Sequence, residues 1–183
     1  MVKLFEKSGN DETKMKILHA IDRSLQDMTV DEISSKAGIS RQTFYRNFTS
    51  KYDIFTWHAI RVEKLYLDEV GRTIDWETGY HHHFRLLAQE HVNYYAGLQY
   101  TYGVPFGIDP MPAHRRQVLI ETIKDFRKAE LSPKIEFCVD AFAKLETELA
   151  DKWFRDGLAE PECFAEHMAS MVPHLLYKIT RIK

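Results

Sequence analysis

The chain has 183 residues, 44% of them hydrophobic, and a formal net charge of −2 at pH 7. This length suits one domain or two small ones, and the near-neutral charge argues against a protein that coats nucleic acid without regard to sequence. No apolar run reaches about eighteen residues and no cleavable leader pattern occurs, so we expect a cytoplasmic protein that does not enter the membrane.

Charge is distributed unevenly along the chain. Up to Lys51 there are nine basic and seven acidic residues, a balance of +2, whereas the remainder has 16 basic and 20 acidic residues, a balance of −4. The sign favours an N-terminal part that meets nucleic acid and a larger part with another task.

A first helix is predicted from Asp11 to Leu25, because apolar residues recur there at helical spacing. Two shorter helices separated by a turn follow. Thr29 opens the first of them with the spacing of a capping box, and Gly38 can take the left-handed conformation that ends it. Ser40 can cap the second, in which two phenylalanines four residues apart point inward.

The outward face of this last helix carries Arg41, Gln42, Thr43, Arg46 and Asn47. An α-helix fits the major groove of DNA, and Arg and Gln side chains can make paired hydrogen bonds to guanine or adenine. The alternative is a polar helix that faces only water. We therefore predict a helix-turn-helix that binds double-stranded DNA.

The segment TVDEISSKAGISRQTFYRNFTSK resembles the DNA-binding motif of the TetR (TetR/AcrR) family of transcriptional regulators, with a match over about residues 15–55. The resemblance rests on the small residue and glycine before the turn, the tyrosine and closing phenylalanine of the second helix, and the lysine that opens the next helix. It implies phosphate contacts by Thr29, Ser40, Thr43, Tyr45 and Lys51, and operator selection by Arg41, Gln42 and Arg46.

All remaining patterns are helical, so the predicted fold class is all-α. A three-helix helix-turn-helix head occupies residues 1–50, and a helical regulatory and dimerisation domain occupies residues 51–183. The first helix of that domain is predicted from Ser50 to Gly71, with Leu65 facing inward, and would span roughly 30 Å. In the resembled family this helix transmits ligand binding to the DNA-binding heads.

Two amphipathic helices end the chain, over residues 135–157 and 164–179, with Leu145 on the inner side of the first and Pro173 kinking the second. A short recognition helix contacts only a few base pairs, so two heads related by a two-fold axis are needed to read a palindromic operator. We predict a homodimer through these last two helices. The alternative is that both fill only their own core.

A small-molecule pocket is predicted among the aromatic residues of the second domain, although a packed core has the same composition. His91 either anchors a ligand or is a satisfied core histidine. The candidate pocket residues are Phe84, Leu87, His91, Tyr95, Phe126 and Phe142. The run from His81 to His83 predicts no metal site, because consecutive helical side chains point about 100° apart, and no cofactor is predicted.

These features predict a sequence-specific transcriptional regulator, most simply a repressor released by a small apolar or aromatic effector. One alternative is a helix-turn-helix regulator controlled by a partner protein instead of a ligand. An enzyme is not predicted, because the sequence contains no nucleophile motif, phosphate-binding loop or metal signature.

Overall fold

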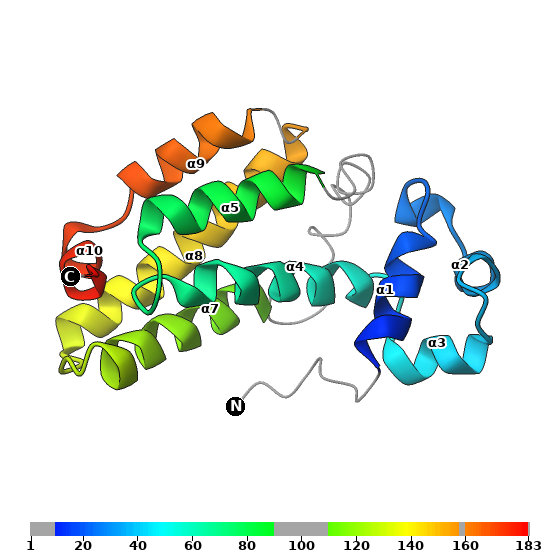
Figure 1. Cartoon of the computed structure of the whole chain (residues 1–183), viewed down its shortest axis with the longest axis horizontal. Helices are drawn as coiled ribbons and strands as arrows, with labels where there is room; N and C mark the ends of the chain where they lie inside the picture. The colour runs from blue at the N-terminus through cyan, green and yellow to red at the C-terminus, as the bar shows by residue number, and fades with distance from the viewer. Residues whose placement is uncertain (1–9, 90–109, 158–159, 183) are drawn as a thin grey trace.

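The computed structural model describes residues 10–89, 110–157 and 160–182, which form nine α-helices and no strand. In Figure 1 a small head, α1 to α3, is joined to a larger helical body by α4, which runs along the middle of the molecule. The predicted all-α class, with a helix-turn-helix head and a helical body, is confirmed. None of the helices in these ranges is long and apolar enough to cross a bilayer.

The head consists of α1 (Asp11–His19), α2 (Val30–Lys36) and α3 (Arg41–Asn47), which pack around one apolar core. Fully buried residues in this core are Ile17, Leu18, Leu25, Met28, Ile33 and Phe44. The prediction that α1 reaches Leu25 is wrong. α1 ends at His19, and Leu25 enters the core from a 3-10 turn, η1 (Leu25–Asp27), which the Ser24 side chain caps.

The prediction that the next helix starts at Ser50 is wrong, because α4 (Asp53–Leu65) begins three residues later and Tyr52 precedes it without a side-chain capping bond. The Asp53 carboxylate accepts hydrogen bonds from the backbone N–H groups of Thr49 and Ser50, at 2.8 and 2.9 Å. An acidic side chain at this position satisfies donors at the helix start and complements the helix dipole.

The predicted continuation of α4 to Gly71 is wrong. The helix ends at Leu65, and a separate 3-10 turn, η2 (Leu67–Glu69), follows the non-helical Tyr66. The 13 residues of α4 span about 20 Å at 1.5 Å per residue, instead of the predicted length of roughly 30 Å. Leu65 lies in the last turn and is 49% exposed, which corrects its predicted inward orientation.

The body surrounds the far end of α4. Figure 1 shows α5 and α9 together on one side of α4 and α7 on the other, with α8 as the longest helix of the bundle. The body elements are α5 (Trp76–Gln89), α7 (Pro110–Glu121), its π-helical continuation η4 (Thr122–Phe126), α8 (Pro133–Arg155), α9 (Pro161–Ser170) and α10 (His174–Thr180).

Two predictions for the C-terminal helices are wrong. Leu145 was expected to face the core but is 41% exposed, and the neighbouring Glu146 is buried in its place. Pro173 does not kink one continuous helix. α9 stops at Ser170 and α10 starts at His174, because proline has no N–H group with which to continue a helix.

Candidate nucleic-acid interface

Local hydrogen bonds fix the turn between α2 and α3. The Thr29 hydroxyl accepts the Glu32 backbone N–H at 3.2 Å, and the Glu32 carboxylate accepts the Thr29 backbone N–H at 2.8 Å, so the predicted capping box is confirmed. Gly38 has a φ of +67°, as the end of α2 requires. The Ser40 hydroxyl then accepts the Thr43 backbone N–H at 3.0 Å and starts α3.

The cap of α2 is reinforced electrostatically. The Thr29 backbone N–H, together with the Arg23 guanidinium 2.8 Å away, lowers the pKa of the Glu32 carboxyl to about 2. Glu32 therefore stays ionised at any ordinary pH, and the start of α2 keeps both of its capping bonds.

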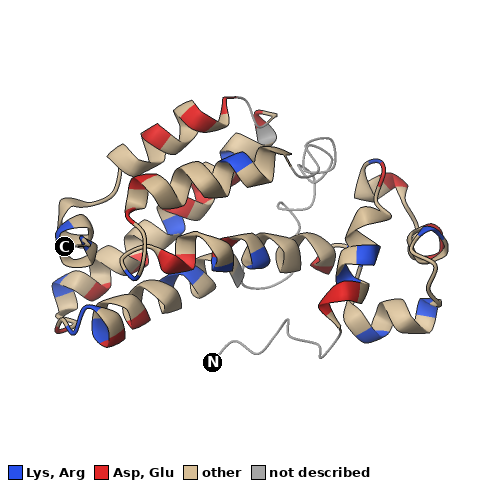
Figure 2. Ribbon diagram, viewed as in Figure 1, with Lys and Arg blue, Asp and Glu red and all other residues tan. Residues whose placement is uncertain are grey.

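One face of α3 is anchored in the head and the other is open. Phe44 is fully buried, whereas Tyr45 is 39% exposed and Arg46 lies fully outside the core. Figure 2 shows that α3 carries basic residues and no acidic ones. Asn47 departs from the prediction that it faces outward: it is buried, and its side-chain amide donates to the Thr43 carbonyl at 2.8 Å.

The three residues predicted to select the operator are all exposed on α3, but their environments differ. Arg41 donates to both carboxylate oxygens of Asp31 on α2, at 3.1 and 3.2 Å, and lies over the Tyr45 ring. Exposed ion pairs of this kind contribute little free energy, so Arg41 can exchange Asp31 for DNA at small cost. Within the described ranges, Gln42 and Arg46 form no hydrogen bond or ion pair.

Lys51 occupies a different place from the one its predicted role suggests. Its ammonium group donates to the backbone carbonyls of Gln26 and Met28, at 3.2 and 2.8 Å, and so ties the start of α4 to the end of η1. An ammonium has three N–H donors, so one remains for a phosphate.

We expect Lys51→Ala to weaken DNA binding without changing base preference and also to lower the thermal stability of the protein, because two carbonyl contacts are lost. Fluorescence anisotropy at several salt concentrations measures the first effect. A salt dependence reduced by about one ion would show a phosphate contact, whereas an unchanged slope with lower stability would leave Lys51 as a link between α4 and the head.

Aromatic and cationic groups couple the head to α4. The rings of Phe48 and Trp57 meet edge to face with their centroids 5.9 Å apart. The buried Lys14 of α1 places its ammonium over both rings, at 5.9 and 5.6 Å. These contacts link α4 to α1 and to the end of α3.

A small pocket of about 40 Å³ lies along another face of α4, between that helix, α5, α7 and α8. It is lined on α4 by Phe55, Ala59 and Glu63, and it includes two of the predicted pocket residues, Phe84 and Leu87.

The other predicted pocket residues lie elsewhere. Phe142 is buried against the Trp76 ring, outside the pocket lining. Phe126 is 55% exposed at the end of η4, where the Arg72 guanidinium lies 4.4 Å from its ring centre. His91 and Tyr95 lie outside the described residues.

A buried polar network next to the pocket was missed by the sequence analysis. Arg115 donates to the Glu146 carboxylate at 2.6 Å and to the Leu67 carbonyl at 2.7 Å, and the Tyr80 hydroxyl donates to the same carboxylate. Although burial disfavours its charge, Glu146 raises the pKa of Arg115, so the guanidinium stays ionised. The available signal was a glutamate within the apolar stripe of α8.

The three consecutive histidines point in different directions, as predicted. His81 contacts the Glu162 carboxylate at 2.7 Å, and His82 lies against the Tyr66 ring. His83 is buried, which lowers its pKa to about 3 and keeps its ring neutral.

Comparisons with known proteins agree with this geometry. The sequence profile described as bacterial regulatory proteins, tetR family, matches residues 20–56, which contain α2, α3 and the start of α4. No curated protein sequence matches the chain. Among solved structures, a tetR-family transcriptional regulator from Streptomyces coelicolor has a similar fold, with a TM-score of 0.54 and 23% sequence identity over 93% of this chain and 81% of that one.

Proposed function

We propose that the chain is a DNA-binding transcriptional regulator, a homodimeric repressor that an effector releases from a palindromic operator. Residues 20–56 support the proposal, because they match the profile of the tetR family of bacterial regulatory proteins. The observation that carries the proposal is the exposed polar face of α3. Its side chains project from a helix that the Ser40 cap and the buried Phe44 hold in a fixed orientation.

α4 supplies a route between effector and DNA. One face of α4 contacts the head through Trp57, and another face lines the pocket through Phe55, Ala59 and Glu63. Pockets for drug-sized ligands are typically about 300–1,000 Å³, so an apolar or aromatic effector larger than the pocket must separate α4 from its neighbours to enter. That separation would displace the head, and an effector that prefers the displaced state by about 1–3 kcal/mol would release DNA.

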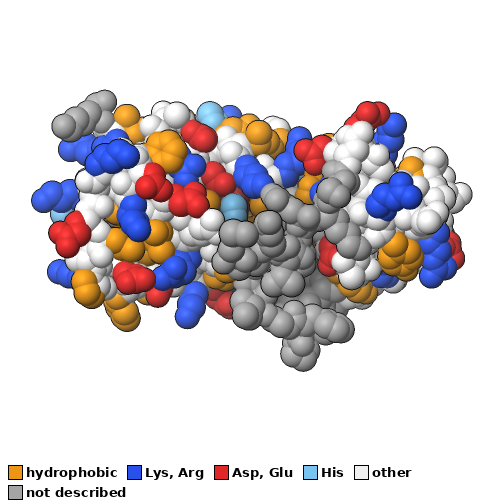
Figure 3. All heavy atoms as spheres, turned by 90° about the horizontal axis from the view of Figure 1, so that it is seen from below, with side chains coloured by type: hydrophobic (Ala, Val, Ile, Leu, Met, Phe, Trp, Pro, Cys, Tyr) orange, Lys and Arg blue, Asp and Glu red, His pale blue; other side chains and the backbone are white. Residues whose placement is uncertain are grey.

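Dimerisation through the C-terminal helices is supported by apolar residues that α8, α9 and α10 leave exposed. Phe137 is 75% exposed on α8, Met171 is exposed at the end of α9, and Tyr177 is exposed on α10. On the face seen in Figure 3 the coloured hydrophobic side chains lie in small groups separated by charged ones. A two-fold axis along α8 would pair the exposed residues with their copies.

The test is selection of duplexes from a random DNA library by the purified protein at two salt concentrations. A two-fold symmetric consensus supports the proposal and supplies a probe for an effector screen. Absence of enrichment, or binding that disappears uniformly as salt rises, would contradict sequence-specific recognition and favour control through a partner protein.

The selected operator also separates the two classes of contact on α3. We expect Gln42→Ala to relax preference at particular base pairs by about 1–3 kcal/mol, and Tyr45→Phe to weaken binding to every operator variant to a similar degree. Anisotropy against all single-base variants of the operator measures both. An equal loss on every variant for Gln42→Ala would remove its assignment as a base reader.

A further inference from the structure

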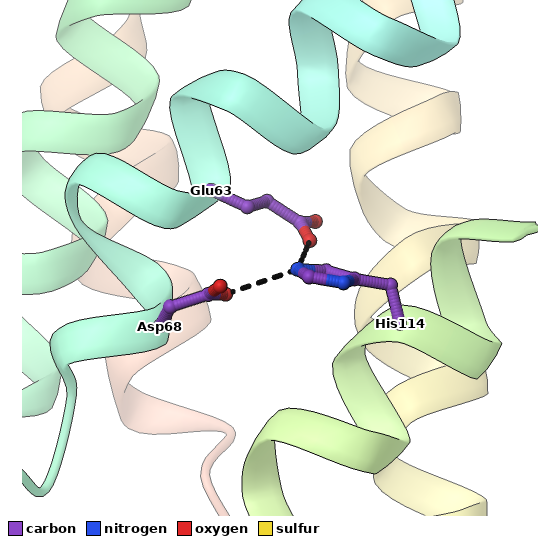
Figure 4. A group of neighbouring side chains, drawn as sticks. All are labelled: Glu63, Asp68 and His114. Atoms are coloured by element: carbon purple, nitrogen blue, oxygen red, sulfur yellow. Dashed lines mark hydrogen bonds and ion pairs between the residues drawn. The ribbon is translucent and has the colours of Figure 1, made fainter. Parts of the chain in front are cut away.

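Two carboxylates and an imidazole converge where α4, η2 and α7 meet, as Figure 4 shows. The His114 Nε2 atom lies 3.2 Å from a carboxylate oxygen of Asp68 and 3.6 Å from one of Glu63, and one ligand atom from each residue lies within 4.8 Å of the others. The side chains of His114, Asp68 and Glu63 are only 19%, 12% and 10% exposed, in that order. We propose that Glu63, Asp68 and His114 bind a divalent transition-metal ion.

The spacing of these ligand atoms suits such an ion. Nitrogen and oxygen ligands lie about 2.1 Å from Zn²⁺, which places neighbouring ligands of a tetrahedral site about 3.4 Å apart. The distances from His114 to Asp68 and to Glu63 lie on either side of this value. An imidazole ligand favours an ion of the Mn²⁺ to Zn²⁺ series over Mg²⁺, which prefers six oxygens in an octahedron.

The charges of the surrounding core favour a dication. Among the described residues of the body, the buried charged side chains are Glu63, Asp68, Glu146 and Arg115. Three buried carboxylates therefore accompany one fully buried guanidinium, and the His114 imidazole lies against two of them. Buried carboxylates are costly unless their charge is balanced, and a bound dication would contribute to that balance.

His83 is a second feature that points to a bound group. It lines the same pocket as Glu63 and is 95% buried, with its ring hydrogen-bonded to the Val62 backbone on one side. Its Nδ1 atom has no hydrogen-bond partner. The neutral Nδ1 offers an acceptor to a water molecule in the pocket that Glu63 also lines. Three protein ligands leave a tetrahedral ion one open position, which a water molecule can fill.

The three proposed ligands join separate elements. Glu63 lies in the last turns of α4, Asp68 in η2 and His114 on α7, so a bound ion would pin the body end of α4. No metal site was predicted from the sequence, because adjacent histidines cannot converge on one ion and no Cys or carboxylate partner stands near them at ligand spacing. His114 is 46 residues from Asp68, so their proximity is visible only in the fold. The proposal does not depend on the regulatory function, since metal binding is measured without DNA.

Isothermal titration of Zn²⁺ into the metal-stripped full-length protein tests the site. The titration uses a Cys163→Ser background, because Cys163 and His167 lie 3.8 Å apart on α9 and would themselves attract Zn²⁺. We expect one tight site per chain, and at least about tenfold weaker binding in each of the isosteric variants Glu63→Gln, Asp68→Asn and His114→Gln.

The matched control is His81→Gln, which removes a histidine from the exposed His81–Glu162 pair and should leave Zn²⁺ affinity unchanged. Circular dichroism establishes that each variant is folded. The visible absorption spectrum of Co²⁺ bound to the protein with Glu63, Asp68 and His114 intact gives a second readout. Intense visible bands indicate a four-coordinate Co²⁺ ion, as the proposed site requires. Absence of binding, equal affinity in all three ligand variants, or loss of binding in His81→Gln would overturn the proposal.

Discussion

Arg115→Met is expected to lower the free energy of unfolding by about 3–5 kcal/mol. The guanidinium is buried, donates to Glu146 and to the Leu67 carbonyl, and lies over the Trp76 ring. Methionine fills similar space but leaves the Glu146 carboxylate buried without its cation. Urea denaturation followed by circular dichroism measures the change.

Two variants separate loss of charge pairing from loss of packing. Arg116→Met changes the next residue of α7, whose partners Asp140 and Glu136 are about half exposed, and should cost less than about 1 kcal/mol. Replacing the whole network, with Arg115→Met, Glu146→Leu and Tyr80→Phe together, should recover most of the loss, because the Glu146 carboxylate is no longer buried without its cation. A cost below about 1 kcal/mol for Arg115→Met alone would contradict this account of the core.

The head was predictable in detail because its signals are local. The capping box at Thr29, the turn at Gly38 and the cap at Ser40 each depend on residues within four positions, and each is found in the structure. The burial of Asn47 was not predicted. Its side-chain amide bonds to the Thr43 carbonyl of its own helix, and this local bond does not depend on whether the residue faces the core or the solvent.

The body was predictable as a class but not as a site. Helical periodicity identifies an apolar stripe, yet it does not show that Glu146 rather than Leu145 faces the core, since the deciding partners Tyr80 and Arg115 are 66 and 31 residues away. The same holds for the end of α4. No residue near Tyr66 indicates that the helix ends there. The Leu67 carbonyl, which accepts a hydrogen bond from the distant Arg115, lies in the turn that follows.

The resemblance to a family assigned residues that local rules could not, and the structure qualifies that assignment. Lys51 was identified as a phosphate contact, and its contacts with the carbonyls of Gln26 and Met28 add a structural task. The predicted pocket residues agree less closely with the structure. Composition alone does not distinguish Phe84, which lines the pocket, from Phe126, which lies on the surface.

Phe137→Asp is expected to convert the protein to a monomer and to weaken operator binding by about 10³-fold or more. Phe137 is 75% exposed, and Leu145, eight residues further along α8, is exposed on the same face. A charge at the centre of this face would have to be buried without a partner in the dimer. A single DNA-binding head retains little affinity beyond its electrostatic attraction to DNA of any sequence, and this accounts for the expected loss of operator affinity.

Sedimentation velocity gives the oligomeric state, and anisotropy with the full palindrome and with one half-site gives the affinities. The matched control is Leu65→Asp, which places the same charge at a 49% exposed leucine on α4, where it should change neither measurement. For Phe137→Asp, the full palindrome should bind no more tightly than the half-site. A variant that stays dimeric would exclude this face of α8 from the interface, and a monomer that still prefers the full palindrome would show that the heads find each other on DNA by another surface.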